Sequence, residues 1–478
     1  MTAMPEDALL DRFAAIVGPA HALRSEIDIA PYVTEPRGRY GGSTRLVLRP
    51  GSVAEVSAIM KLASETRTPI VPQGGNTGLV GGQMPDGSGR EVVLSLSRLN
   101  RIREIDLQSN TVTAEAGVIL HALREAADGV ERLFPLSLAS QGSCEIGGNL
   151  SSNAGGVGAL AYGVARDLCL GLEVVLPTGE VLDDLRKLKK DNTGYDLKDL
   201  FVGAEGTLGV ITAAVLKLFP KPKGRTVAWL GIMSPEEALS LFTLATEKAG
   251  PALTAFELMS ERTLSFVLKH VPGSVAPLKE SCPWNVLMEI SSGRSEEDAL
   301  ALLDDIVQEY MVGTDNDDVP YFEGVMASSL AQSDAFWHLR ESMSEAQKGE
   351  GGSIKHDISV PVASIPRFIR EAGEAVASVA PDARVVCFGH MGDGNLHYNV
   401  SQPAGGDTAA FLALYPAMNH AVHEVVRSLG GSISAEHGIG RMKRDELIAT
   451  APPVAIDLMR RVKRAFDPAN IMNPGKVI

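Results

Sequence analysis

The stretch PQGGNTGLVGGQMP, residues 72–85, places five glycines directly after an apolar segment, PIVPQ, at 69–73. Glycine adopts backbone conformations that let N–H groups turn toward an anion such as a diphosphate. The stretch is not GxGxxG, and it is not a Walker A loop, because no Gly-Lys-Ser/Thr follows. Taken alone, it predicts either an anion-binding loop or a tight structural turn.

The segments around this loop predict a β-α-β unit. LVLRP (46–50), a helical segment over 54–66 and PIVPQ follow one another. Further strands are predicted at VVLSL (92–96) and NTVTAEAG (110–117), and LEVVLPTGEVL (172–182) predicts a hairpin closed by Thr178-Gly179. The proline-lysine break PKPKG, at 220–224, predicts the first domain boundary.

Two more glycine-rich loops occur in the same half of the chain. GSCEIGGNLSSNAGG covers 142–156, and GAEGTLGVIT covers 203–212 and enters a strand. A weak GxGxxA match at 156–161 follows no strand and is discounted. Three separate Gly/Ser/Asn loops in one lobe suit a long, polar, extended ligand that a single loop could not hold.

These three loops, in this order, resemble the flavin-binding lobe of the vanillyl-alcohol-oxidase-type flavoproteins, and the end FDPANIMNPGK (466–476) resembles the segment that returns to the flavin. The resemblance covers about 40–478. It implies an α+β fold, with a two-lobed FAD-binding domain at 1–224 and an α+β substrate (cap) domain at 225–430. Residues 431–478 are then the C-terminal segment that returns to the flavin.

The resemblance also implies which residues contact FAD. Those expected at the diphosphate are Gly74, Gly75, Asn76, Thr77 and Gly78. Those expected along the adenosine and isoalloxazine portions are Pro135, Gly142, Ser143, Gly148, Asn149, Ser152, Gly206, Val210 and Ile211, and Pro72 and Asn473 are also expected to contact FAD. Some relatives attach FAD through a His or Cys, which the first loop lacks. Cys144 is the thiol to consider, but a free cysteine is usually an inert small hydrophobe, so noncovalent FAD is expected.

Residues 225–380 have a different pattern. Strands are predicted at 226–233, 285–291 and 353–360, and amphipathic helices at 235–250 and 296–310. This alternation predicts an α+β sheet layer with helices on one face.

The segment FGHMGDGNLHYNV, residues 388–400, sets two histidines about a Gly-Asp-Gly-Asn turn. Folding the segment on that turn places Met391 opposite Leu396 and His390 opposite His397, with Cβ atoms roughly 5 Å apart. Such a pair can hold a metal ion, or it can be a hydrogen-bonded core pair.

This segment and SAEHGIGRMKRDEL (434–447) resemble the D-2-hydroxyacid dehydrogenases, nearest to the D-2-hydroxyglutarate type. The resemblance adds Glu436 as a third ligand to His390 and His397. Two imidazoles and a carboxylate with an open position suit a catalytic divalent metal, most often zinc. The substrate hydroxyl and C1 carboxylate would fill that position. In this family the residue matching His437 is the base, so the resemblance implies that His437 takes the hydroxyl proton. Asn399, two residues past His397 and so on the same strand face, is a candidate donor to the C1 carboxylate.

The grip on the far end of the substrate comes from a predicted helix and the strand after it. The helix, 333–352, is expected to be capped by Ser333 and ended by Gly351-Gly352, so that Arg340 and Ser344 share a face. Lys355 is expected on one strand face with Asp357 and Ser359. By resemblance Arg340, Ser344 and Lys355 hold a distal carboxylate, with Ser344 where relatives usually have Thr. The alternative is that the cations are solvated or paired with acids such as Glu341.

The expected reaction is oxidation of a D-2-hydroxyacid, best D-2-hydroxyglutarate, to the 2-oxoacid, with D-lactate and D-malate open as substrates. A metal-dependent hydrolase or lyase and a non-catalytic flavoprotein are the alternatives from other classes. The electron acceptor (an electron-transfer flavoprotein, a quinone or a cytochrome) stays open, as does a homodimer.

Bulk properties bound the partners and the compartment. The net charge of −15 argues against nucleic acid and anionic membranes. Four widely separated cysteines predict reduced thiols in a cytoplasmic protein. The acidic N-terminus does not resemble a signal peptide, and no apolar run reaches the ~18 residues of a membrane span.

Overall fold

The computed structural model describes residues 7–35, 38–313 and 323–478, and the chain divides into two compact units. Unit 1 consists of the chain up to Gly155, Gly163–Pro220 and His437–Ile478, and unit 2 consists of Gly156–Tyr162 and Lys221–Glu436. The chain therefore changes unit after Pro220 and after Glu436, where the sequence analysis expects boundaries at 224 and 430. The excursion of 156–162 into unit 2 has no counterpart in the sequence analysis.

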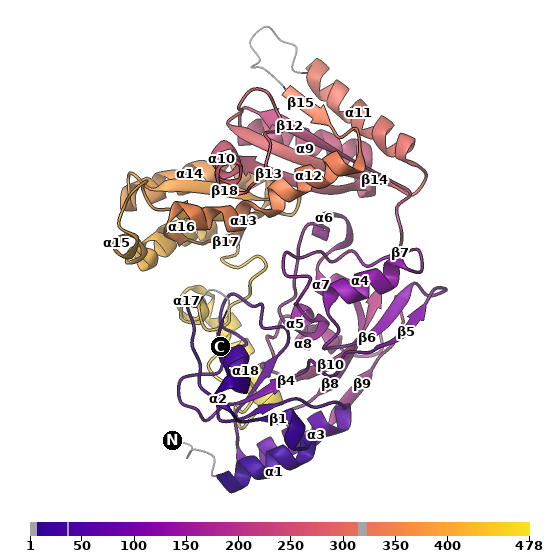
Figure 1. Ribbon diagram of the computed structural model, residues 1–478, viewed down its shortest axis with the longest axis vertical. Coiled ribbons are helices and arrows are strands. Elements are labelled where there is room, and N and C mark those ends of the chain that lie inside the picture. Colours follow the sequence, from indigo (N-terminus) through magenta and orange to yellow (C-terminus); the bar gives the residue numbers. More distant parts are fainter. Residues whose placement is uncertain (1–6, 36–37, 314–322) are drawn as a thin grey trace. The chain divides into compact units, whose positions relative to one another are not determined.

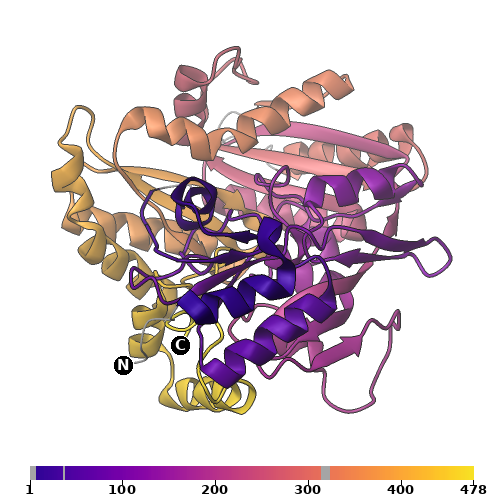
Figure 2. The same cartoon turned by 60° about the horizontal axis from the view of Figure 1, so that its bottom comes forward.

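Unit 1 contains the predicted β-α-β arrangement. Strand β2 (Val47–Leu48), helix α3 (Val53–Thr66) and strand β3 (Ile70–Gln73) follow one another, and β4 (Val92–Ser95) pairs in parallel with both strands. Ser52 begins α3 by accepting a hydrogen bond from the Glu55 backbone. Helix α1 (Asp7–Val17) packs against α3, as the two dark helices at the front of Figure 2 show.

A second sheet of unit 1 is antiparallel, in the order β5-β6-β10-β8-β9. Its strands are β5 (Ile102–Asp106), β6 (Thr111–Glu115), β8 (Cys169–Val175), β9 (Val181–Asp184) and β10 (Val210–Lys217). The predicted hairpin at Thr178-Gly179 is confirmed, with Gly179 at φ +86°. The other elements of unit 1 are β1 (Ala22–Leu23), α2 (Glu26–Val33), α4 (Leu120–Asp128), β7 (Arg132–Leu133), α5 (Ile146–Ser151), α7 (Ala165–Leu168), α8 (Lys198–Phe201), β11 (Phe219–Pro220), α17 (Arg444–Thr450) and α18 (Pro453–Phe466).

Unit 2 is built on an eight-stranded sheet in the order β15-β12-β14-β13-β18-β19-β16, with β17 also paired to β19. The strands are β12 (Gly224–Ile232), β13 (Leu253–Ser260), β14 (Trp284–Ser292), β15 (Glu323–Met326), β16 (Ser353–Ile354), β17 (Asp357–Ser359), β18 (Arg384–His390) and β19 (Asn395–Ser401). β16 and β17 share one register on β19, because Ile354 lies opposite Val400 and Asp357 opposite His397. The predicted alternation of the strand over 353–360 is therefore kept.

Helices cover both faces of this sheet, so the expectation of helices on one face is wrong (Figure 1). Residues such as Leu230 and Leu258 pack with α9 (Pro235–Ala249), α11 (Glu296–Gly313), α14 (Ile365–Val379) and α16 (Tyr415–Ser428). Residues such as Trp229 and Phe388 pack with α10 (Glu261–His270), α12 (Leu330–Glu341) and α13 (Met343–Ala346). The strands are apolar at successive positions because both faces are buried.

None of the described helices is long and apolar enough to cross a membrane. The four cysteines are buried and form no disulfide.

Candidate functional site

The three glycine-rich loops of unit 1 line one cleft, with about 880 Å³ of empty space. We call it the glycine cleft, and its lining runs through 72–83, 145–152 and 205–211 and includes His437. The predicted FAD residues on this lining are Pro72, Gly74, Gly75, Asn76, Thr77, Gly78, Gly148, Asn149, Ser152, Gly206, Val210 and Ile211.

Four other residues of the predicted FAD set are not on this lining. Pro135 is buried, and Gly142 and Ser143 are exposed. Asn473 is buried, and its amide donates to the carbonyl oxygens of Gly82 and Glu205, at 2.9 and 2.8 Å. In unit 1, Asn473 thus links two loops of the cleft without lining it.

The cleft is shaped by missing side chains. A Cβ atom at Gly75 would lie 1.9 Å from the Ser143 carbonyl oxygen, so only glycine lets the first two loops pack together. A Cβ at Gly148 would meet nothing within 4 Å, although Gly148 lines the cleft. The side chain of Asn76 is already engaged, donating to the carbonyls of Pro31 and Thr34. The first loop therefore offers mainly backbone to a ligand.

Two buried polar atoms on the cleft lining have no hydrogen-bond partner: Oε2 of Glu145 and Nδ2 of Asn149. Burial raises the pKa of Glu145 to about 8, against the attraction of Arg49. Burial also raises the pKa of the neighbouring Cys144 thiol, which disfavours the reactive thiolate. Unsatisfied polar atoms beside glycine-made space fit a large polar ligand such as FAD. Sequence reasoning missed Glu145, whose one signal is an acid inside a glycine loop.

In unit 2, polar side chains form a row on one face of the sheet. Glu257 of β13 lies opposite His390 of β18, Phe388 of β18 opposite His397 of β19, and His397 opposite Asp357 of β17. The predicted pairing of His390 with His397 is wrong by two residues. The turn takes Met391–Asp393 and Gly394, at φ +87°, instead of 392–395, so the two histidines are diagonal neighbours. Their ring centroids are 6.1 Å apart on the same face.

His390, His397 and Glu436 form what we call the metal group. Nε2 of His390 and Nε2 of His397 lie 3.7 and 3.9 Å from the two carboxylate oxygens of Glu436. One ligand atom from each residue falls within 4.8 Å of the others. Asp357 supports the group by accepting a hydrogen bond from the Glu436 backbone N–H at 3.0 Å. Two imidazole nitrogens and a carboxylate oxygen are a donor set that fits a divalent metal ion.

Glu257 orients the first of these ligands. Its Oε1 lies 2.6 Å from Nδ1 of His390, which leaves Nε2 directed toward Glu436. Such a carboxylate behind a histidine ligand fixes the ring and raises its basicity. Burial lowers the pKa of His390, but the charge of Glu257 raises it to about 9. The surroundings thus favour positive charge at this point, which a proton or a metal ion can supply.

Arg340 pairs with the same carboxylate. Its Nε donates to Oε2 of Glu257 at 2.7 Å, and its guanidinium lies over the Phe388 ring. Burial raises the pKa of Glu257, yet the charges of His390 and Arg340 together lower it to about 2. Arg340 is therefore buried and ion-paired through Glu257, a partner that the sequence analysis did not consider.

Two of the other predicted substrate residues, Lys355 and Asn399, bond to Gln347. Lys355 Nζ donates to Oε1 of Gln347 at 2.6 Å, and Nδ2 of Asn399 donates to the same oxygen at 3.1 Å. Ser344 is exposed. The single helix predicted over 333–352 is wrong: α12 is capped by Ser329, and the chain breaks at Ser342 before α13. Arg340 and Ser344 therefore lie on different helices.

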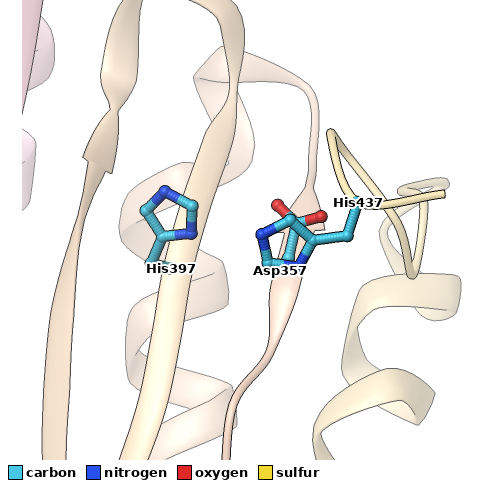
Figure 3. A group of neighbouring side chains, drawn as sticks. All are labelled: Asp357, His397 and His437. Atoms are coloured by element: carbon cyan, nitrogen blue, oxygen red, sulfur yellow. The ribbon is translucent and has the colours of Figure 1, made fainter. Parts of the chain in front are cut away.

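His437 follows Glu436 directly and opens the last segment of unit 1, where it lines the glycine cleft. In unit 2, Figure 3 shows the side chains of Asp357 and His397, the register partners on β17 and β19. One peptide bond thus joins a ligand of the metal group in unit 2 to a residue of the cleft in unit 1.

Unit 1 thus has a cleft that fits a large polar cofactor, and unit 2 has a group of side chains that fits a divalent metal ion. Comparison with known proteins identifies the family. The FAD binding domain model matches 44–184, and the model of the FAD linked oxidases, C-terminal domain, matches 221–477. The chain belongs to the FAD-linked oxidases and is an FAD-dependent oxidoreductase. This excludes the hydrolase or lyase alternative.

Its relatives narrow the class further. The chain is 39% identical to the mitochondrial D-2-hydroxyglutarate dehydrogenase of Danio rerio over 440 residues, covering 91% of this chain and 79% of the relative. It is 35% identical to the D-2-hydroxyglutarate dehydrogenase of Stutzerimonas stutzeri over 477 residues, covering 99% of each. Among solved structures, p-cresol methylhydroxylase with substrate bound matches with a TM-score of 0.75 and 16% identity, over 98% of this chain and 96% of that one. That likeness shows the fold alone and confirms the predicted α+β class.

Proposed function

We propose that the protein oxidises a D-2-hydroxyacid, best D-2-hydroxyglutarate, to the 2-oxoacid. The reaction uses noncovalent FAD and a divalent metal ion, and Zn²⁺ is the first ion to test. The metal group carries this proposal, because it joins two imidazoles and a carboxylate and because the buried carboxylate of Glu257 orients one of the imidazoles, His390. The names of the relatives support the choice of substrate.

The roles of the residues follow from the reaction. Removing two electrons from a secondary alcohol takes a hydride from Cα and a proton from the hydroxyl group. Bound FAD supplies the hydride acceptor. His390, His397 and Glu436 would hold the divalent metal ion, which would supply Lewis acidity toward the substrate hydroxyl. His437 accepts the hydroxyl proton on a ring nitrogen, a task that suits an imidazole near neutral pH. Asn399 donates to the C1 carboxylate.

Lys355 and Arg340 are the proposed cationic partners of a distal carboxylate. Arg340→Ala is a poor first test, because it leaves Glu257 without its guanidinium and so disturbs His390. Lys355→Met is sharper, since Lys355 contacts Gln347 rather than Glu257. Lys348→Met is the matched control, because Lys348 is exposed and bonds Glu345.

The experiment is anaerobic flavin bleaching by D-2-hydroxyglutarate, D-malate and D-lactate. We expect the highest kcat/KM with a dicarboxylate. Lys355→Met should lower the ratio of kcat/KM for the dicarboxylate to kcat/KM for D-lactate, whereas Lys348→Met should leave this ratio unchanged. A wild-type preference for D-lactate would move the protein to D-lactate oxidation on the same scaffold.

The state of the flavin is tested separately. Acid precipitation should release all flavin to the supernatant, because the first loop has no His or Cys and the Cys144 thiol is buried. Flavin that stays with the pellet contradicts noncovalent binding.

A further inference from the structure

The turn that follows His437 donates two backbone hydrogen bonds to one carboxylate of unit 1. Oε1 of Glu205 accepts a hydrogen bond from the Ile439 N–H at 2.7 Å, and Oε2 accepts one from the Gly440 N–H at 2.8 Å. Both Glu205 and His437 line the glycine cleft. The turn also needs its glycines, because Gly438 and Gly440 have φ of +81° and +51°, and a Cβ at Gly438 would lie 2.7 Å from Oε1 of Glu205.

Glu205 is itself held in an uncommon backbone conformation. Its φ is +51°, in the left-handed region that a residue with a side chain rarely adopts. Its N–H donates to the Ser151 carbonyl at 2.8 Å, and its own carbonyl accepts from the Asn473 amide at 2.8 Å. Strain of this kind persists where surrounding contacts over-determine it, and it concentrates at functional sites. The conformation aims the carboxylate at the two amides after His437.

We propose that Glu205 is a positioning residue, whose carboxylate fixes the turn after His437 and thereby the place of that imidazole in the glycine cleft. The proposal rests on the role of His437 as base in the proposed function. Glu205 thus has two roles. Its backbone is part of the third glycine loop, which lines the cofactor cleft, and its side chain positions the proposed base. Asn473 becomes the outer brace of this arrangement.

Rates of flavin reduction by D-2-hydroxyglutarate are measured in four variants: Glu205→Ala, Glu205→Gln, His437→Ala and the double variant Glu205→Ala/His437→Ala. A misplaced base typically costs about 10–100-fold in rate, so Glu205→Ala should be slower by that factor. The rate of Glu205→Gln should lie between those of Glu205→Ala and wild type, because glutamine keeps one acceptor oxygen but replaces the other by an NH2 group, which cannot accept from an N–H. The double variant should be no slower than His437→Ala, since residues acting through one group are not additive.

A second readout does not depend on turnover. With FAD bound, hydrogen exchange of the amides at 439 and 440 should accelerate in Glu205→Ala. The matched control is Asp106→Ala, whose carboxylate accepts from the Gln108 and Ser109 amides in the turn after β5, away from the cleft lining. It should change neither the reduction rate nor exchange at 439–440.

Each outcome decides. Losses that multiply in the double variant, unchanged exchange at 439–440, or loss of FAD from both Glu205 variants overturn the positioning role. If His437→Ala reduces flavin at the wild-type rate, the proposed base is wrong, and the exchange measurement still reports whether Glu205 holds the turn.

Discussion

The glycine cleft of unit 1 and the metal group of unit 2 are built in opposite ways. The cleft is made by absent side chains, such as those of Gly75 and Gly148, and by backbone that the loops leave exposed. The metal group is made by side chains: strand register places His390 and His397 on one sheet face, Glu257 orients His390, and Asp357 bonds the backbone of Glu436. A site made of backbone tolerates little added volume, whereas a site made of side chains depends on its partners. A substitution in one of the two sites should therefore leave ligand binding at the other site unchanged.

The largest separation should come from His390→Ala. Loss of a metal ligand should lower turnover by more than about 100-fold, beyond the usual cost of losing only a partner of a ligand. FAD should stay bound, because none of the residues on the cleft lining changes. Metal content is measured by elemental analysis and flavin by absorbance. His338→Ala, which removes an exposed histidine from α12, is the control. Joint loss of metal and FAD from His390→Ala would contradict the separation.

Glu257→Gln should weaken the metal group without dismantling it. The amide keeps a contact to His390 but loses the charge that favours a cation, so metal affinity should fall about 10–100-fold. Competition with a chromophoric chelator measures this. Glu289→Gln is the control, because Glu289 lies on the neighbouring strand and bonds Trp337 and Thr254 instead of a histidine. Equal losses in the two variants would mean that Glu257 acts only on the stability of the sheet.

Two glycine substitutions test the cleft in the same way. Gly148→Ala places a methyl group in open space, so we expect an unchanged Tm without flavin and a Kd for FAD raised about tenfold, or about 1.4 kcal/mol. Gly75→Ala meets a carbonyl oxygen, so we expect it to destabilise the flavin-free protein by about 1–3 kcal/mol. Flavin fluorescence titration and thermal unfolding separate the two effects. A lowered Tm in Gly148→Ala would show that the added methyl group disturbs the flavin-free fold, so that the space at Gly148 is not open for a ligand.

The same contrast explains what the sequence could predict. The β-α-β unit around α3, the hairpin at Gly179 and the glycine loops depend on residues close together in the chain, so local patterns predict them. The partner of His390 comes from Glu257, 133 residues away, and no local pattern indicates that pairing. The predicted hairpin register was wrong because turns at 391–394 and at 392–395 were both compatible with this sequence. The break at Ser342 was not predicted, because helical periodicity continues across it.

The smallest expected effect concerns pH, and it belongs to the cleft. Burial raises the pKa of Glu145 to about 8, so the folded, flavin-free protein disfavours its charged form. The stability that Glu145 contributes is then fully present below the ordinary pKa of a glutamate. It is lost as pH rises toward 8, because the unfolded chain ionises first. Glu145→Gln removes this proton, so its Tm should fall less than that of wild type between pH 5 and 8, by a few degrees at most.

Thermal unfolding of flavin-free protein at several pH values measures the effect, and Glu125→Gln, which alters an exposed acid on α4, is the control. Parallel pH profiles for wild type and Glu145→Gln would mean that the Glu145 carboxyl is solvated or paired with Arg49 in solution. A steeper decline in wild type alone would instead show that the cleft holds a neutral carboxyl beside the first glycine loop. A neutral acid can donate a hydrogen bond to a polar ligand, whereas a carboxylate there would repel a diphosphate. The glycine cleft would then depend on one side chain as well as on its backbone, and the contrast with the metal group would be one of degree.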